Sequence, residues 1–109
     1  MIAEMIREKV LRHTRQELPY STAVQLELID EERREEGFVR ILASIIVEKP
    51  GQKKIVIGRG GQMIKKIGTE ARHDIQRLLG VEKVYLELNV KVIEGWRNRD
   101  RLLLELGVS

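Results

Sequence analysis

The segment that decides the fold is Ile55-Val56-Ile57-Gly58-Arg59-Gly60-Gly61-Gln62-Met63-Ile64. An apolar run stops at the tetrapeptide Gly58-Arg59-Gly60-Gly61, and an amphipathic stretch leaves it. Glycine lets the backbone adopt positive φ and approach another backbone closely, because it has no Cβ. At the start of a helix such a turn leaves N–H groups unpaired, and an anion such as a phosphate suits that place. The tetrapeptide alone is equally compatible with a phosphate-binding loop and with a connection between helices that merely needs glycines.

Positive charge is concentrated around this tetrapeptide. Residues 49–79 carry eight Lys and Arg against two acidic residues, a net charge of +6. Residues 1–48 carry seven against ten, a net of −3, and residues 80–109 carry five of each. Phosphate backbones attract such a patch whatever their base sequence. The coincidence of the patch with the glycine loop therefore favours nucleic-acid binding over a merely solvated charged face.

The stretch that follows, Gln62–Leu79, is predicted to be a helix that ends at Gly80. Its apolar residues recur at spacings of three and four, and so share one face: Ile64, Ile67, Ala71, Ile75 and Leu78. An interior glycine costs about 1 kcal/mol relative to alanine, so Gly68 indicates close packing against a strand. A cationic edge is expected along one flank, made of Lys65, Thr69, Arg72 and Gln76.

Two strands are predicted before the glycine loop and one after it. Thr22–Asp30 alternates, with one face formed by Val24, Leu26 and Leu28. Phe38–Glu48 alternates too, with an apolar row of Val39, Ile41, Ala43, Ile45 and Val47. We expect these two strands to form an antiparallel hairpin around a charged loop. Val84–Val92 is the third strand.

Helical patterns are predicted at both ends of the chain. Residues 2–18 carry apolar positions at helical spacing, and Pro19 ends that helix. Arg97–Leu106 reads as a short terminal helix. Residues 52–57 fit either a strand or one helical turn, and periodicity does not choose between them.

Composition limits the class of protein. A chain of 109 residues with 42% hydrophobic residues and a net charge of +3 is read as a single domain over 1–109. Cysteine is absent, which excludes a disulfide framework, a thiolate nucleophile and a zinc knuckle and suits a reducing cytosol. No apolar run approaches the roughly 20 residues of a membrane span, and the N-terminus is not a signal peptide. A cytoplasmic location is expected.

No enzyme active site can be assembled from the sequence, and no catalytic residue, cofactor or metal site is predicted. His13 and His73 are expected on separate helices, facing different ways and without an obvious carboxylate partner. Gly58-Arg59-Gly60-Gly61 begins like a dinucleotide-binding fingerprint, but Met63 stands where the last glycine is needed. The sequence holds no G-x-x-x-x-G-K-[ST], so it has no P-loop.

The GXXG tetrapeptide and the order of predicted elements resemble a type II KH domain. Among KH domains the chain is most similar to the C-terminal domain of the Era family of bacterial GTPases. The resemblance covers nearly the whole chain and rests on Ile6-Arg7-Glu8-Lys9, Glu17-Leu18-Pro19-Tyr20-Ser21, Gly51-Gln52-Lys53-Lys54-Ile55-Val56-Ile57-Gly58, Ile67-Gly68-Thr69-Glu70-Ala71-Arg72, and Val90-Lys91-Val92 followed by Gly95-Trp96. It implies an α+β fold with a three-stranded sheet covered on one face by helices, a helical 52–57 segment and a short C-terminal helix.

The resemblance also implies a function. In that family the KH domain follows a GTPase domain, binds the 3′ end of small-subunit (16S) ribosomal RNA and helps the small subunit mature. This chain would correspond to the C-terminal part without the GTPase. The implied partners are single-stranded RNA, the 30S subunit and, peripherally, the membrane, and the chain is expected to be a monomer. The rival interpretation is a protein-interaction module that uses the KH fold without RNA.

The RNA-binding residues are predicted around the glycine loop. The sugar-phosphate backbone would lie on the loop and the start of the following helix, and the bases on an apolar floor walled by the second strand. The predicted set is Lys53, Lys54, Ile57, Gly58, Arg59, Gly60, Gly61, Gln62, Ile64, Lys65, Lys66 and Arg72. At most one aromatic is expected to stack on a base, from Tyr20, Phe38, Tyr85 and Trp96, and Trp96 is expected instead to seal the sheet edge or the terminal helix.

Overall fold

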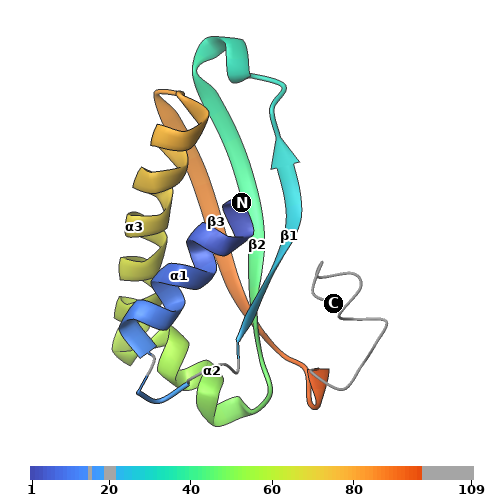
Figure 1. Cartoon of the computed structure of the whole chain (residues 1–109), viewed down its shortest axis with the longest axis vertical. Coiled ribbons are helices and arrows are strands. Elements are labelled where there is room, and N and C mark those ends of the chain that lie inside the picture. The colour runs from blue at the N-terminus through green and yellow to red at the C-terminus, as the bar shows by residue number, and fades with distance from the viewer. Residues whose placement is uncertain (15, 19–21, 97–109) are drawn as a thin grey trace.

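The computed structural model describes residues 1–14, 16–18 and 22–96 (Figure 1). Its elements in chain order are α1 (Ile2–Thr14), β1 (Ala23–Asp30), the 3-10 turn η1 (Arg34–Glu36), β2 (Phe38–Val47), α2 (Pro50–Ile57), the 3-10 turn η2 (Arg59–Gly61), α3 (Gln62–Leu79) and β3 (Lys83–Val92). The predicted terminal helix Arg97–Leu106 lies outside the described residues. No helix in the described part of the chain is both long and apolar enough to span a bilayer.

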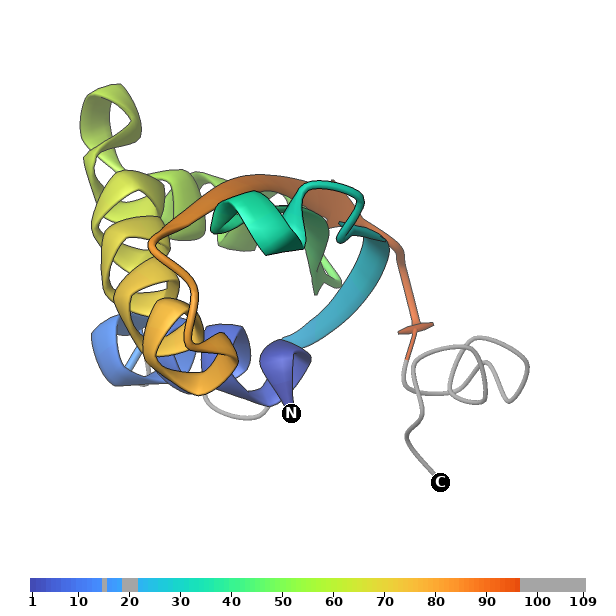
Figure 2. The same cartoon turned by 90° about the horizontal axis from the view of Figure 1, so that it is seen from above.

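The three strands form one mixed sheet in the order β1-β2-β3. β1 and β2 pair antiparallel, as the predicted hairpin requires, whereas β2 and β3 pair parallel. A parallel pair needs a long crossover, and α2 and α3 supply it. The helices gather on one face of the sheet (Figure 2), which confirms the predicted α+β architecture. Because α3 leads directly into β3, the helix and this edge strand lie side by side.

The hydrophobic core lies between the sheet and the three helices. The predicted row of β2 is fully buried at every position: Val39, Ile41, Ala43, Ile45 and Val47. The helices contribute Ile6 and Val10 from α1, Val56 from α2, and Ile67, Ala71 and Ile75 from α3. Gly68 packs beneath β3 as expected, since an added Cβ would stand 3.6 Å from the Leu88 Cδ1 atom.

Three details differ from the sequence-based expectations. A β-bulge between Leu26 and Leu28 shifts the register of β1, so Leu28 leaves the face it was predicted to share with Leu26 and is exposed. α1 ends at Thr14 rather than at residue 18, and the Thr14 hydroxyl donates to the Val10 carbonyl. Leu78, predicted on the apolar face of α3, is 42% exposed. Leu79 packs against the core at the end of the helix instead.

Candidate nucleic-acid interface

The segment before the glycine loop is a helix, which resolves the ambiguity of residues 52–57. Pro50 begins α2, where its fixed φ suits a helix and its missing N–H costs nothing. The side-chain oxygen of Gln52 accepts from the backbone N–H groups of Glu48 and Lys49, at 2.9 and 3.0 Å. α2 ends at Ile57, and the N–H of the next residue, Gly58, donates to the Lys54 carbonyl. α2 and α3 are therefore joined only by the GXXG tetrapeptide.

Each glycine of the tetrapeptide has positive φ, and one of them is also sterically required. Gly58 has φ 75° and ψ 174°, and a Cβ there would lie 2.6 Å from the Met63 Cβ. Gly60 and Gly61 have φ 61° and 77°, with open space where a Cβ would be. Gly58 thus fixes the close turn onto α3, whereas Gly60 is exposed.

The start of α3 lies directly at this turn, where the Gln62 N–H donates to the Arg59 carbonyl. Gly61 precedes the helix in a left-handed conformation, and no side chain caps the helix. The first N–H groups of a helix have no partner within it, and the helix dipole adds a partial positive charge there. Arg59 is exposed beside these groups. The end of α3 that meets the loop therefore suits a phosphate.

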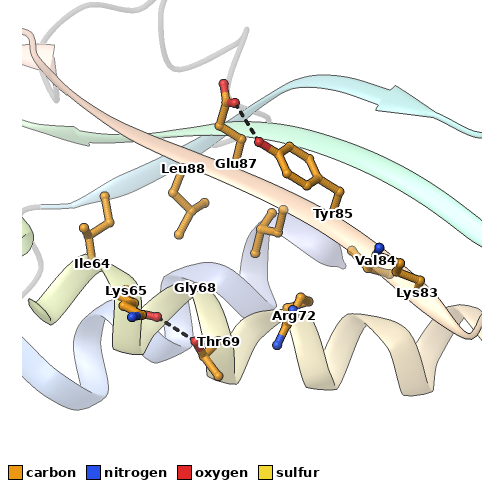
Figure 3. Close-up of a pocket in the computed structure, with 11 residues that line it drawn as sticks. Ile64, Lys65, Gly68, Thr69, Arg72, Lys83, Val84, Tyr85, Glu87 and Leu88 are labelled. Atoms are coloured by element: carbon orange, nitrogen blue, oxygen red, sulfur yellow. Dashed lines mark hydrogen bonds between the residues drawn. The ribbon is translucent and has the colours of Figure 1, made fainter. Parts of the chain in front are cut away.

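A groove of about 550 Å³ runs from this end between α3 and β3 (Figure 3). The α3 side is formed by Ile64, Lys65, Gly68, Thr69 and Arg72, and the β3 side by residues 83–88. Leu86 and Leu88 face α3 and give the groove an apolar floor with Ile64. The wall is β3, so the expectation of a wall formed by the second strand was wrong. β2 is the central strand, and its helix-facing row is buried in the core.

The structure brings most of the predicted residues to this groove and its loop end. Ile64, Lys65 and Arg72 line the groove, while Lys66 shares with Gln62 and Lys65 a shallow pocket on the adjoining face of α3. Lys53 and Lys54 are exposed on α2. Ile57 is only partly buried and packs against the core; it does not line the groove.

The cations near the loop form no ion pair within the part of the chain that the structure describes, although the charge of Lys66 contributes to lowering the pKa of Glu70. Among the described residues, no ion pair involves the predicted cations Lys53, Lys54, Arg59, Lys65, Lys66 and Arg72. On the α1-facing flank of α3 the opposite holds. There Lys9 lies 2.8 Å from Asp74, and Arg77 also pairs with Asp74. These contacts lower the pKa of Asp74, with the Lys9 hydrogen bond as the largest cause. Positive charge is thus neutralised between the helices and left available around the loop and groove.

His13 has a carboxylate partner, contrary to the sequence-based expectation. Its Nε2 lies 2.9 Å from Glu70 Oε1, and Arg12 approaches the same oxygen at 3.7 Å. The hydrogen bond from His13 is the main cause that lowers the pKa of Glu70. His13 is half-buried between α1 and α3, whereas His73 is exposed on α3, so the two histidines lie on separate helices as expected. Within the described residues no cluster of three or more metal-ligating side chains occurs.

Of the aromatic residues near the groove, Tyr85 is the exposed one, and its ring points away from α3 beside Glu87 (Figure 3). Trp96 is 5% exposed and packs against Ala23 of β1 and Ile46 of β2, so its contact within the described residues is with paired residues of the sheet; the role predicted for it at the sheet edge or the terminal helix stays a prediction. Phe38 is covered by the Arg33 guanidinium at 5.2 Å, and Tyr20 lies outside the described residues. Tyr85 is 47% exposed, and its hydroxyl donates to Glu87 at 3.3 Å.

Of the β3 residues that line the groove, the prediction named Tyr85 alone, as one of four candidates for stacking, and it missed Lys83, Val84, Leu86, Glu87 and Leu88. A signal for them exists in the order of elements. A helix that crosses over between parallel strands packs against the sheet beside the strand that follows it. Recognition of β3 as parallel to its neighbour would have placed these residues opposite α3.

Comparison with known families identifies the fold. A family model described as a KH domain matches residues 17–97. This chain belongs to the KH domain family. It is similar to the GTPase Era of Trichlorobacter lovleyi and that of Leuconostoc citreum, each with 55% identity over 98% and 100% of this chain, respectively. The chain spans only 35% of either relative. The resemblance to the Era family is confirmed by these matches.

Solved structures lead to the same family. The crystal structure of a point variant of Aquifex aeolicus Era bound to GDP·AlF4⁻ matches 97% of this chain with a TM-score of 0.89 and 40% identity. A crystal structure of Era in complex with MgGDPNP and nucleotides 1506–1542 of 16S ribosomal RNA matches equally well. In both cases the chain covers 35% of the solved chain. The likeness thus extends over the whole KH domain.

Proposed function

We propose that this chain binds short single-stranded RNA along the GXXG loop and the α3–β3 groove. The loop and the first N–H groups of α3 hold the sugar-phosphate backbone, and the bases lie on the apolar floor beside β3. The residues that carry the interaction are Lys53, Lys54, Gly58, Arg59, Gly60, Gly61, Gln62, Ile64, Lys65, Lys66 and Arg72, and Ile57 supports the loop from the core.

The observation that carries this proposal is that some cations form ion pairs with acidic residues of the protein and others do not. The six predicted cations around the loop and groove make no ion pair with a described residue, whereas Lys9 and Arg12 of α1 and Arg77 of α3 do. A cation without a protein partner keeps its full attraction for phosphate. The uncapped start of α3 and the groove lie among these cations, so the charge, the donors and the space coincide.

The RNA is proposed to be the 3′ end of 16S ribosomal RNA. The solved relative that carries nucleotides 1506–1542 of that RNA supports this assignment, as do 40% identity and a TM-score of 0.89. The role that follows is in maturation of the small subunit, on the 30S particle, by a cytoplasmic monomer. Peripheral membrane association stays a prediction of the resemblance alone. No step of GTP hydrolysis is assigned to this chain.

The test is a binding titration by fluorescence anisotropy. The probes are an RNA with the 16S sequence 1506–1542, a short single strand from its 3′ end, and the same short strand annealed to its complement. A-form duplex hides its base edges, so the single strand should bind more tightly than the duplex. With roughly three phosphates neutralised, log K should fall with log salt at a slope of about −2.

Two results would contradict the proposal. Equal affinity for the duplex and the single strand would contradict the proposal that bases lie in the groove. An affinity independent of salt would contradict the proposal that the cations attract the phosphates. Failure of every RNA to bind the folded chain would instead support the rival interpretation, a KH fold used as a protein-interaction module.

A further inference from the structure

β1 is an edge strand of the sheet, and one of its sides is unpaired among the described residues. The strand order is β1-β2-β3, so β2 pairs with the inner side of β1 only. No backbone–backbone hydrogen bond outside the β1–β2 ladder involves residues 23–30 in that part of the chain. Proteins usually protect a free edge with Lys, Pro, a bulge or a covering element. Ala23–Asp30 contains no Lys and no Pro, and its only such device is the bulge before Leu28.

The second half of β1 exposes apolar side chains on both faces of the sheet. Leu28 and Ile29 are 39% and 41% exposed. Ile29 pairs with Ile41, which lies in the core, so Ile29 points to the helix side of the sheet. Its neighbour Leu28 therefore points to the open side. A helix or loop laid on one face would cover only one of the two, whereas a strand added at the edge covers both, because its side chains alternate between the faces.

Acidic side chains surround this end of the edge. β1 ends at Asp30, and the turn that follows holds Glu32 and Glu35. None of these three carboxylates forms an ion pair with a described residue. The two arginines of the turn are paired with other glutamates of the turn, so they leave this charge uncompensated. An RNA strand, or a second copy paired through the same exposed end, would meet like charge. A basic strand would meet opposite charge.

We propose that the free edge of β1 binds an extended, basic segment of a partner protein as a fourth strand. In this mode of recognition the main chain supplies hydrogen bonds and the side chains supply specificity. The partner segment has a short apolar centre, which covers Leu28 and Ile29, and flanking Lys or Arg residues, which face Asp30 and the turn. The groove lies at the opposite edge, between β3 and α3 (Figure 1), so the two edges of one sheet serve a protein and an RNA separately.

The experiment adds a synthetic peptide to the full chain and follows amide hydrogen exchange and chemical shifts by NMR. The probe is a short peptide with blocked ends, an apolar Val-Ile-Val centre and lysines on both sides. One control peptide carries glutamates in place of the lysines, which reverses the charge. A second control carries N-methylated amides at its centre, which removes the main-chain donors that a strand needs.

With the lysine peptide, the outward N–H groups of β1 should exchange more slowly, and both control peptides should leave them unchanged. The double variant Leu28→Gln with Ile29→Gln should bind the lysine peptide about 2- to 30-fold more weakly, the range for loss of two cross-strand contacts. Leu78→Gln is the matched control, because Leu78 is 42% exposed but lies on α3, and it should bind the peptide as the wild type does. Circular dichroism verifies that each variant is folded.

Unchanged exchange at β1, or equal binding of either control peptide, would overturn the proposal. Outward N–H groups of β1 that are already protected without peptide would overturn it too. Protection that grows with protein concentration would assign the edge to a second copy of the chain, and protection that is lost on removal of residues 97–109 would assign it to the chain's own end. Each of these results leaves the proposed RNA binding intact, because the groove lies at the other edge.

Discussion

Replacement of Arg59 and Gly60 by aspartate tests whether the glycine loop binds a phosphate. Both residues are exposed, and Arg59 has no ion pair with a described residue. The substitution therefore leaves the core unchanged and places two negative charges where the phosphate is proposed to lie. Each carboxylate would repel the RNA backbone and compete for the N–H groups at the start of α3.

The cost to folding can be worked out from the loop geometry. A Cβ at Gly60 would meet no atom within 4 Å, so the aspartate causes no clash. Its cost is the left-handed conformation, φ 61° and ψ 21°, which is about 1 kcal/mol for a non-glycine residue and is least unfavourable for Asp and Asn. An exposed substitution at Arg59 changes the free energy of unfolding by about 0.5 kcal/mol or less. The double variant should thus be destabilised by about 1.5 kcal/mol at most.

The cost to binding should be larger. Loss of one charge-assisted contact between Arg59 and a phosphate is worth about 1.5–3 kcal/mol, which corresponds to about a 10- to 150-fold weaker affinity. Repulsion by the new carboxylates adds to this loss. Anisotropy with the short single strand measures the affinity, and thermal unfolding measures the stability.

The matched control is the neutral variant Arg59→Asn with Gly60→Asn. It places a non-glycine residue in the same left-handed backbone conformation at position 60 but adds no negative charge. It should therefore unfold like the aspartate variant and bind RNA more tightly than that variant. If the folded aspartate variant binds RNA with the strength of the wild type, the loop is only a structural turn, and the central reasoning fails.

Three further predictions follow from the same contacts. Gly58→Ala should lower the free energy of unfolding by about 3 kcal/mol, far more than Gly60→Asn, because its Cβ would overlap Met63; urea unfolding measures this. Asp74 has a pKa below its ordinary value of 3.8, so the stability it contributes is present above that pH and is lost as the pH falls below it. The fall in melting temperature on acidification should therefore be smaller for Asp74→Asn than for the wild type. Tyr85→Ala should weaken RNA binding about fivefold or more, whereas Tyr85→Phe should not, if a base stacks on the exposed ring.

The sequence predicts most of the fold because its patterns follow local physics. The apolar spacing of α3 and the alternation of β2 place the same residues in the core that the structure buries. The predicted bounds of α3, Gln62–Leu79, are those observed, because glycines stand at both ends. What local patterns miss is a change of register. Leu28 continues the alternation of β1 in sequence, but the bulge before it reverses its face, and that depends on pairing with β2.

The candidate site was predicted in part for the same reason. The loop and its cations are contiguous in the chain, so composition and spacing reveal them. The groove wall comes from a strand that follows α3 in the chain, and only the parallel pairing of β2 and β3 brings that strand alongside the helix. The pairing of His13 with Glu70 likewise joins residues 57 positions apart. Contacts of this kind depend on topology and leave no periodic signal in the sequence.

The fold also places the acidic and the basic segments of the sequence at opposite ends of the molecule. The acidic hairpin turn between β1 and β2 lies at one end of the long axis, and α2 lies at the other (Figure 1). The turn holds five acidic residues in 30–36 against two arginines, and both arginines are paired with glutamates there. Cations without such partners among the described residues follow α2, the loop and the groove side of α3. An approaching polyanion is therefore repelled at the hairpin and attracted at the loop, and such steering favours association with the groove before any base is read.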